Sequence, residues 1–300
     1  MEDFRILAIN PGSTSTKIAV YQNMNPVFVK NITHPNEELA QFEHVADQFH
    51  FRKEIIYKEL EEADIEINKI QAVVGRGGML KPIASGVYQV NDAMKSDLYD
   101  HPIKEHASNL GGLIADDIAR ALPDAKAYIA DPVVVDELDE IARVSGHPLF
   151  KRISIFHALN QKSIARQHAK SIMKHYEDLN LIIVHMGGGI TIGAHQKGKV
   201  IDVNQGLDGE GPFSPERSGT LPSGDLVRFC FSGKYSEKEV LKMVVGNGGI
   251  VAYLGTNSAY EAEQRAQNGD EQAKFILEAL AYQVAKSIGS MVPVLKGEVD

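Results

Sequence analysis

The sequence contains a single cysteine, Cys230, among 300 residues. One thiol cannot form a disulfide within the chain or build a cysteine-based zinc site, and it fits a reducing compartment. A chain of this length needs neither a disulfide nor a structural metal to be stable, because folding buries roughly three quarters of the surface that the unfolded chain exposes. Hydrophobic residues at 43% and charged residues at 24% exclude a disordered chain and a collagen-like repeat.

Positive charge is also scarce. The chain has 31 lysines and arginines against 40 acidic residues, which gives a net charge of −9. Such a chain lacks the basic face that neutralises phosphates, so we expect neither nucleic acid nor an anionic membrane as a partner. A local phosphate pocket of backbone amides and a few arginines is still compatible with this balance.

Long apolar runs are missing as well. The start of the chain, residues 1–5, has neither the basic nor the apolar region of a signal peptide. The strand-like run 181–194 contains His185 and a row of three glycines, which excludes a membrane-spanning helix of about 20 apolar residues. We therefore expect a cytoplasmic protein.

Hydrophobic patterning divides the chain into strands and helices. Apolar or β-branched runs predict strands at 5–10, 16–21, 27–32, 71–74, 126–130, 179–185, 190–195 and 200–203. Apolar residues at helical spacing predict helices over 36–63, 108–122 and 270–295, and a helix that begins with a capping box at Ser236. The helix over 108–122 is expected to begin on a capping serine, Ser108.

One plan of strand, glycine turn, strand, polar turn and strand occurs twice, near residues 6–27 and 179–203. Aligned without a gap, the copies match Gly12 with Gly187, Thr16 with Thr191 and Ala19 with Ala194. Glycine-turned hairpins are common enough to align by chance, but a long mixed helix–strand segment after each copy favours a duplication. We therefore predict two domains, over 1–150 and 151–300.

A hydroxyl-rich segment follows the first strand and reads Asn10-Pro11-Gly12-Ser13-Thr14-Ser15-Thr16-Lys17. Its backbone amides, hydroxyls and lysine could cradle a phosphate. It is neither a P-loop nor a Rossmann fingerprint, because a strand replaces the helix that both motifs require. On the residues alone, a hydroxyl-rich hairpin turn is an equally good interpretation.

Three glycines join the strands of the second copy in the segment His185-Met186-Gly187-Gly188-Gly189. Glycines at such a place cost backbone entropy and often mark a close approach of the backbone to another group. A plain β-bulge is the alternative. The matching positions of the two glycine turns favour a binding function over it.

Four more polar side chains follow predicted strands or lie near glycines: Arg76, Asp131, His157 and Arg217. The planar fork of arginine suits phosphoryl or carboxylate oxygens, and a carboxylate can hold Mg²⁺ directly or through water. Each of these residues alone is more often a surface charge or a structural group. Together they would serve phosphoryl transfer, in which positive groups stabilise a spread negative charge.

These segments occur in the order found in the acetate kinase family, within the superfamily that also contains sugar kinases and actin. The chain resembles its butyrate kinase branch in particular. The segments that carry the resemblance are Asn10-Pro-Gly-Ser-Thr-Ser-Thr-Lys17, Val73-Val-Gly-Arg-Gly-Gly78, Ile129-Ala-Asp-Pro132, Ile155-Phe-His-Ala158, His185-Met-Gly-Gly-Gly189, Pro215-Glu-Arg-Ser-Gly219 and Gly246-Asn-Gly-Gly-Ile-Val-Ala-Tyr-Leu-Gly-Thr256.

The resemblance implies an α/β fold of two RNase H-like lobes, the actin-like ATPase architecture, with mixed sheets flanked by helices and the active site in the interdomain cleft. It implies a kinase that uses ATP and Mg²⁺ to convert butyrate to butyryl phosphate and ADP by direct in-line transfer. A carboxylate is already ionised at neutral pH, so the acceptor needs no general base. Relatives of this kind are usually homodimers or larger assemblies.

The resemblance also assigns roles to the candidate residues. Arg76 would bind the substrate carboxylate or the transferring phosphoryl group, and Arg217 would bind the phosphoryl group. His157 would donate a hydrogen bond to that group, and Asp131 would organise Mg²⁺ and its water. The phosphates and the nucleotide would be held by residues of the two glycine segments: Asn10, Gly12, Ser13, Thr14, Lys17, His185, Gly187, Gly188 and Gly189.

Two other functions stay open. A kinase of the same fold could act on acetate, propionate, a branched acid or a sugar hydroxyl, for which Asp131 could serve as the general base. A non-catalytic nucleotide-binding module descended from such a kinase is the other alternative. In the family an adenosine motif and a closing helix follow the long second-domain helix, so the resemblance also implies a chain truncated before both.

Overall fold

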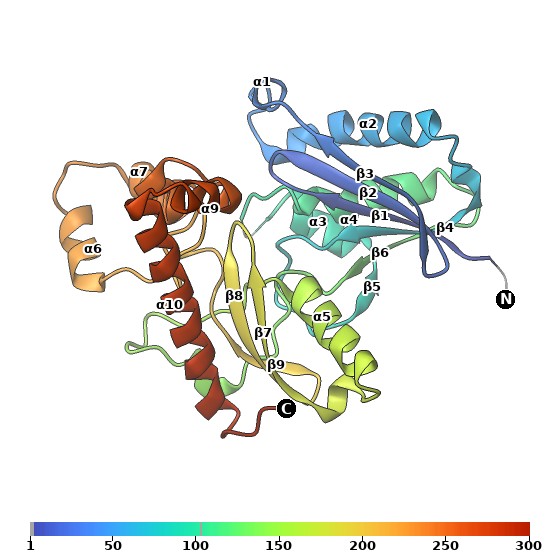
Figure 1. Ribbon diagram of the computed structural model, residues 1–300. Coiled ribbons are helices and arrows are strands. Elements are labelled where there is room, and N and C mark those ends of the chain that lie inside the picture. The colour runs from blue at the N-terminus through green and yellow to red at the C-terminus, as the bar shows by residue number, and fades with distance from the viewer. Residues whose placement is uncertain (1–2, 103) are drawn as a thin grey trace. The chain divides into compact units, whose positions relative to one another are not determined.

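The computed structural model, which describes residues 3–102 and 104–300, consists of two units, Met1–Val135 and Asp136–Asp300 (Figure 1). The division lies 15 residues before the boundary at 150 that the sequence suggested. The segment after Asp136 belongs to the second unit because it bonds to the second sheet. The N–H of Asp139 donates to the Ile201 carbonyl, and the Glu137 carboxylate accepts the N–H of Val200.

The first unit is built on a six-stranded mixed sheet in the order β3-β2-β1-β4-β6-β5. The strands are β1 (Arg5–Pro11), β2 (Ser15–Gln22), β3 (Asn25–Thr33), β4 (Ile70–Arg76), β5 (Val87–Gln89) and β6 (Lys126–Ala130). Strands β1 to β3 are antiparallel neighbours, whereas β4 runs parallel to β1, and β6 parallel to β4. The carboxyl ends of β1, β4 and β6 therefore meet at one edge, where ligands bind in open α/β sheets.

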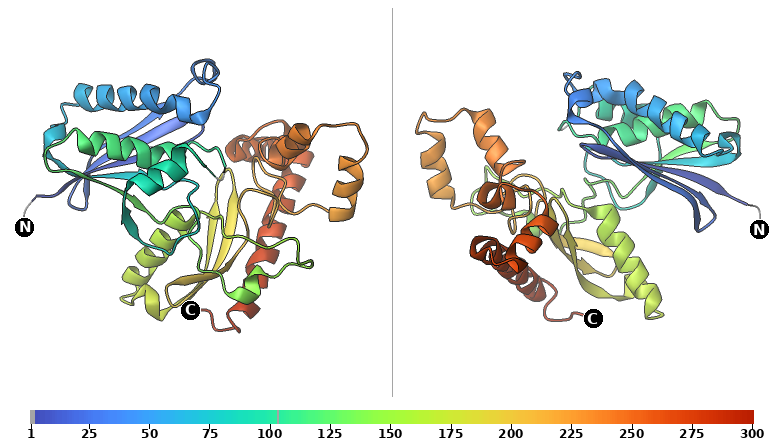
Figure 2. Two further views of the ribbon diagram at one scale, coloured as in Figure 1. Left: turned by 180° about the vertical axis from the view of Figure 1, so that it is seen from behind. Right: turned by 45° about the horizontal axis from the view of Figure 1, so that its top comes forward.

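Two helices cover one face of this sheet, α2 (Phe49–Glu62) and α4 (Asn109–Arg120) (Figure 2). Buried apolar residues recur along both helices at helical spacing, and α4 packs on β4, β6 and β1. A Cβ on Gly75 of β4 would overlap the carbonyl of Gly111 in α4, so glycines at both positions let the strand and helix touch. The smaller elements are α1 (Asn36–Leu39), α3 (Asp92–Tyr99) and the 3₁₀ turns η1 (Val45–Gln48) and η2 (Ile67–Lys69).

Two helix predictions for the first unit are wrong in detail. The single helix expected over 36–63 is divided into α1, η1 and α2. It is interrupted because the Asp47 carboxylate accepts the N–H of His44, at 3.0 Å, and so starts a new helical turn there. Ser108 does not cap α4 with its side chain, because its own backbone is already helical and its hydroxyl contacts the His106 ring, at 2.8 Å.

The second unit has a three-stranded antiparallel sheet of β7 (Asn180–Met186), β8 (Ile190–Gln196) and β9 (Lys199–Val203). Helices α5 (Ala158–Ser171) and α10 (Glu271–Val294) cover its two faces (Figure 1). Side chains of β7 alternate between these faces: Leu181 packs towards α5, and Ile182 and Val184 pack in the cluster that contains α10. This sheet repeats the antiparallel part of the first sheet, as the predicted duplication requires.

The remaining elements of the second unit are η3 (Glu140–Arg143), which precedes α5, η4 (Tyr176–Asp178), which lies between α5 and β7, and α6 (Ser223–Cys230), α7 (Glu237–Val244), α8 (Ile250–Leu254) and α9 (Ala259–Gln267), which lie between β9 and α10. The predicted capping box of α7 is confirmed, since Ser236 and Glu239 exchange side-chain-to-backbone hydrogen bonds. Among the described residues, no helix, α10 included, combines the length and the apolarity that crossing a bilayer requires.

A histidine on β8 is completely buried and makes stability depend on pH. Burial, with the nearby charge of Lys162, lowers the pKa of His195 from 6.5 to about 3. Between those two values the unfolded chain binds a proton that the folded chain does not, so acidification favours unfolding. Within this window each pH unit costs about 1.4 kcal/mol of unfolding free energy.

We therefore expect the urea midpoint of the protein to fall between pH 6.5 and pH 4.5, and to fall less in a His195→Asn variant. The variant removes the group that titrates only after unfolding. His168→Asn, on the exposed side of α5, is the matched control and should keep the pH dependence of the parent. Equal pH dependence in the parent and in His195→Asn would contradict a neutral buried imidazole.

Candidate functional site

The turn between β1 and β2 groups the residues of the first hydroxyl-rich segment. Asn10 and Lys17 are direct partners across the two strands, so their side chains lie on the same face of the sheet. Both are exposed, as are Ser13 and Thr14 in the turn itself. The N–H of Gly12 closes the turn by donating to the Ser15 carbonyl at 2.7 Å. The hairpin thus presents amide, hydroxyl and ammonium groups together, as a phosphate would require.

A fully buried arginine of α2, Arg52, holds this turn from the core side. Its guanidinium donates to the carbonyls of Gly12 at 2.8 Å, Ser15 at 3.1 Å and Ser13 at 3.2 Å, and to the hydroxyl of Thr16 at 3.0 Å. The turn carbonyls therefore point to the core side and away from an anion on the outer face. Sequence reasoning missed Arg52, because charged neighbours on the same helix hide which position is buried.

Arg52 also supplies charge beneath the turn. Among the described residues no carboxylate lies within ion-pair distance of Arg52, and its other partner is the amide oxygen of Gln48. Burial lowers its pKa to about 10, which still leaves the guanidinium charged at neutral pH. A buried cation that is balanced only by neutral oxygens raises the positive potential at the turn. Thr16 shares in this arrangement, since its hydroxyl also contacts the ring of His34 at 2.8 Å.

Arg76 and Asp131 lie at the same edge of the first sheet as Asn10. The guanidinium of Arg76, at the end of β4, donates to the Asn10 side-chain oxygen at 3.3 Å. Arg76 pairs with Ala130 in β6, and Asp131 follows directly. Partial burial lowers the pKa of Arg76. Asn10, Arg76 and Asp131 therefore lie at the ends of three neighbouring strands.

Asp131 is 5% exposed and has a φ of +35°, which is rare for a residue other than glycine. Its carboxylate accepts the hydroxyl of Ser85 at 2.6 Å and the N–H of Gly86 at 2.9 Å. Backbone strain that neighbouring contacts hold in place is typical of functional sites. The same hydrogen bonds fix the position of the carboxylate at the end of β6.

The residues around Asp131 fit a hydrated Mg²⁺ ion better than a metal ion held by protein ligands alone. Residues 3–102 and 104–300 contain no group of three or more His, Cys, Asp or Glu side chains that could hold an ion. A dedicated all-protein metal cage therefore does not fit this part of the chain. Mg²⁺ that keeps several waters and binds phosphate oxygens does fit, because it needs only one or two protein carboxylates.

The glycine turn between β7 and β8 lies directly against Arg217. A Cβ added at Gly189 would overlap the Arg217 guanidinium, so this position must be glycine for the arginine to lie there. The hydroxyl of Ser214 donates to the Gly188 carbonyl at 2.7 Å and ties the same segment to the turn. The close approach that the glycines predict therefore involves the candidate arginine itself.

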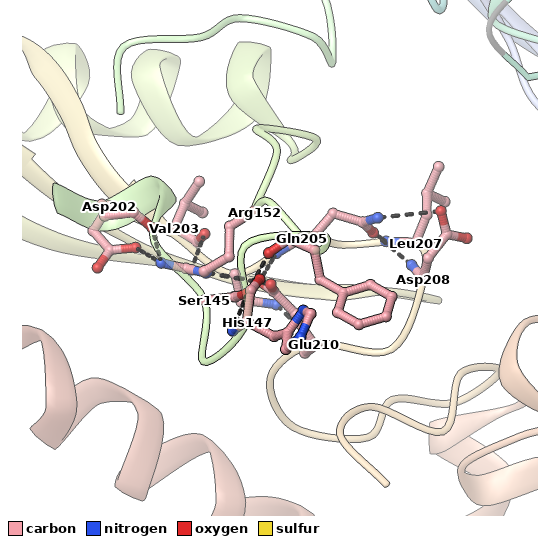
Figure 3. Close-up of polar contacts among 12 residues, drawn as sticks. Ser145, His147, Arg152, Asp202, Val203, Gln205, Leu207, Asp208 and Glu210 are labelled. Atoms are coloured by element: carbon pink, nitrogen blue, oxygen red, sulfur yellow. Dashed lines mark hydrogen bonds and ion pairs between the residues drawn. The ribbon is translucent and has the colours of Figure 1, made fainter. Parts of the chain in front are cut away.

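Arg217 is fixed further by the loop that follows β9. Its guanidinium donates to the Gly206 carbonyl. Figure 3 shows how Arg152 supports this loop, with its guanidinium bonded to the carboxylates of Asp202, at 3.0 Å, and Glu210, at 3.2 Å. Glu210 in turn accepts the N–H of Gln205 at 2.8 Å, beside Gly206. Arg152 was not among the predicted site residues, and it acts here by holding the loop that Arg217 contacts.

His157 and His185 form a stacked pair near this turn. His157 immediately precedes α5, and its ring lies 3.7 Å from that of His185, with 10° between the planes. The Nδ1 atom of His157 is 2.9 Å from the Thr191 hydroxyl, and Nδ1 of His185 is 2.9 Å from the Asn160 side-chain oxygen. His157, His185, the glycine turn and Arg217 are thus grouped within the second unit.

The glycine-rich segment 246–256 packs behind the Arg217 loop. The N–H of Gly246 donates to the Glu216 carbonyl at 2.7 Å, and the N–H of Ile250 donates to the Ser214 carbonyl at 3.1 Å. Gly249 has a φ of +65°, and a Cβ there would overlap the same Ser214 carbonyl. This segment therefore supports Arg217 rather than forming a separate site.

Comparison with known proteins gives matches along nearly the whole chain. Residues 149–300 match the model of the Acetokinase family. Butyrate kinase 2 and Butyrate kinase 1 of Clostridium acetobutylicum are 56% and 55% identical to it over 297 residues, which is 99% of this chain and 83% of each relative.

Solved structures with the same fold include an acetate kinase and a propionate kinase. Porphyromonas gingivalis acetate kinase has a TM-score of 0.77 and 18% identity over 99% of this chain and 81% of that one. A propionate kinase from Francisella tularensis has a TM-score of 0.74 and 21% identity over 97% of this chain and 80% of that one. At these identities the matches concern the fold alone, and they confirm the predicted α/β architecture of actin-like lobes.

Proposed function

The chain belongs to the acetokinase family, and from that premise we propose that it transfers the γ-phosphoryl group of ATP to butyrate, giving butyryl phosphate and ADP. The observation that carries this proposal is the identity of 56% and 55% to two butyrate kinases over 99% of the chain. Family membership makes the chain a carboxylate kinase, and the choice of butyrate follows from these two relatives.

The proposed acceptor determines what the protein must supply. Butyrate is ionised at neutral pH, so its carboxylate can attack without a general base. Catalysis then consists of positioning the reactants and of stabilising the charge that spreads over the transferring group. The chain offers fixed positive groups and fixed hydrogen-bond donors for this work, and none of the proposed steps needs a proton to be removed from the acceptor.

We assign these tasks to particular side chains. Arg76 would bind the carboxylate or the phosphoryl group with its guanidinium, and Arg217, held against Gly189, would stabilise the phosphoryl charge. His157 would donate a hydrogen bond to a phosphoryl oxygen. The phosphates and the nucleotide would be held by Asn10, Gly12, Ser13, Thr14, Lys17, His185, Gly187, Gly188 and Gly189. The grouping of these residues within each unit supports the assignment.

A divalent metal belongs to the same proposal. When bound, Mg²⁺ would neutralise phosphate charge and organise water, and Asp131 would hold it directly or through that water. The position of the Asp131 carboxylate, held by hydrogen bonds from Ser85 and Gly86, supports this role. Assembly into a homodimer or larger oligomer and a cytoplasmic location stay predictions.

Hydroxylamine trapping tests the proposed acceptor. Acyl phosphates form hydroxamates with hydroxylamine, so incubation with MgATP and a series of acids reports acid phosphorylation and chain-length preference together. We expect kcat/KM for butyrate to exceed that for acetate about 10-fold or more, because each buried methylene contributes roughly 1 kcal/mol or more to discrimination. The Arg217→Ala protein, purified in parallel, controls for a contaminating kinase.

Each alternative function has its own outcome in this assay. A preference for acetate, propionate or a branched acid would overturn butyrate and keep the carboxylate kinase. ADP formation with a sugar and no hydroxamate would indicate a hydroxyl acceptor. Nucleotide binding without any phosphorylated product would support the non-catalytic module.

A further inference from the structure

A row of buried polar side chains leads away from His157 through the second sheet. The Thr191 hydroxyl is 2.9 Å from Nδ1 of His157 and 2.8 Å from Nε2 of Gln161. The side-chain oxygen of Gln161 is 2.9 Å from Nε2 of His195, and Nδ1 of His195 is 2.7 Å from the Tyr176 hydroxyl. Thr191, Gln161 and His195 are completely buried, and Tyr176 is 3% exposed.

The direction of the inner hydrogen bonds follows from which groups can only accept. The amide nitrogen of Gln161 is 3.0 Å from the backbone carbonyl of Thr191, which has no proton to give, so the nitrogen must face Thr191. The amide oxygen therefore faces His195 and accepts a hydrogen bond from its Nε2–H. His195 is neutral, because burial lowers its pKa to about 3, so its Nδ1 accepts from the Tyr176 hydroxyl.

The same reasoning settles the last hydrogen bond. The Thr191 hydroxyl has one proton, and one of its lone pairs accepts from Gln161. Among the described residues, Nδ1 of His157 is the other hydrogen-bonding atom that contacts this hydroxyl. Leaving the hydrogen of a buried hydroxyl without an acceptor costs free energy, so the Thr191 hydroxyl donates a hydrogen bond to Nδ1 of His157. Nδ1 of His157 then carries no proton, and the ring proton lies on Nε2.

Two glycines make room for this row. A Cβ on Gly193, in the middle of β8, would lie 2.5 Å from the Gln161 side-chain oxygen. A Cβ on Gly206 would lie 2.6 Å from the Thr191 methyl group, which is on the far side of that side chain from its hydroxyl. The ring of His185 stacks on the ring of His157 and limits its rotation.

We propose that the hydrogen bonds running from Tyr176 through His195, Gln161 and Thr191 fix His157 as the neutral tautomer with its proton on Nε2. Thr191 and Gln161 are then positioning residues, which keep His157 a hydrogen-bond donor and prevent its second nitrogen from taking that proton. This use of the donor rests on the proposed function, in which Nε2 faces a phosphoryl oxygen. The tautomer itself is a property of the free protein and does not depend on it.

Imidazole NMR of the protein without substrate tests the tautomer. With ¹³C- and ¹⁵N-labelled histidine, the signals of His157 are assigned by their loss in a His157→Gln variant. Ring nitrogen and carbon shifts distinguish a proton on Nε2 from one on Nδ1. We expect the Nε2 form in the parent and in Thr191→Ser, which keeps the hydroxyl. In Thr191→Val, which removes it at constant shape, we expect a mixture of tautomers or protonation of the ring.

The controls separate this effect from general damage. Thr16→Val changes the aligned threonine of the first unit and should leave the His157 signals unchanged. If Thr191→Val does not fold, Gln161→Met removes the donor that orients the Thr191 hydroxyl and should also shift the tautomer populations. An Nδ1 proton in the parent, or the same His157 signals in the parent and in Thr191→Val, would overturn the proposal.

Kinetics then test the positioning role separately. If the protein phosphorylates butyrate, Thr191→Val should lower kcat about 10- to 100-fold with little change in KM, and Thr191→Ser should restore most of it. An altered tautomer with unchanged kcat would overturn the positioning role. Failure of the parent to phosphorylate any acid would contradict the proposed function and leave the NMR result standing.

Discussion

Replacing Arg217 with alanine should lower kcat for butyryl phosphate formation about 100- to 1,000-fold, the effect typical of losing one donor that stabilises transition-state charge. Two contacts hold the guanidinium. It packs against Gly189, where any side chain would overlap it, and it donates a hydrogen bond to the Gly206 carbonyl. A group fixed in advance costs no reorganisation when charge develops, and its removal acts on kcat more than on KM.

Two variants define the control for this experiment. Arg228→Ala removes another arginine of the same unit, one that is exposed and pairs with Asp225 on α6, and should keep the activity of the parent. Arg217→Lys keeps the charge without the planar fork and should recover only part of the rate. Activity of Arg217→Ala within a few-fold of the parent, measured by hydroxamate formation, would remove Arg217 from the proposed mechanism.

Replacing Arg52 with methionine should lower the unfolding free energy by about 3 kcal/mol or more, because several partly buried oxygens lose one charged donor together. Three carbonyls of the β1–β2 turn accept hydrogen bonds from this guanidinium. A loosened turn with less positive potential should also bind MgATP more weakly. Urea denaturation measures the first effect, and the KM for ATP measures the second.

Lys53→Met is the matched control, since it removes a positive charge from the next position of the same helix. Lys53 pairs with Asp117, which is partly exposed, and such pairs contribute roughly 1 kcal/mol or less. Its stability and its KM for ATP should therefore stay near those of the parent. An Arg52→Met protein as stable as Lys53→Met would contradict the role of Arg52 beneath the turn.

The strands were predictable because their signal is local. Each of the eight predicted strands is present with nearly the predicted bounds, since a short apolar run between turn residues identifies a strand without knowledge of its partners. β5 was missed because three residues are too few to show alternation. The helix over 36–63 was predicted as one piece because the competing hydrogen bond between His44 and Asp47 leaves the apolar spacing intact.

Residues of the candidate site were likewise predictable where their signal is local. Asn10, Lys17 and Arg76 could be selected because they lie in short segments whose composition already suggests a ligand. Arg52 and Gln161 could not, because the groups that Arg52 contacts on the β1–β2 turn lie 36 to 40 residues away and those that Gln161 contacts lie 30 to 34 residues away. Gly193 is the exception: a glycine inside a buried strand is a local signal for a close approach, although it does not identify what approaches.

The aligned threonines, Thr16 and Thr191, show how a repeated hairpin can be specialised. Each places a buried hydroxyl beneath a glycine turn, and each contacts one histidine and one helical side chain. The partner helices are not repeats of each other, because α2 follows its hairpin in the chain and α5 precedes its own. Arginine on α2 gives the first turn a permanent charge, whereas glutamine on α5 gives the second an uncharged connection with a fixed direction. The helix that contacts each hairpin therefore determines the charge beneath its glycine turn. A substitution on one helix would change the charge at one turn and leave the other turn unchanged.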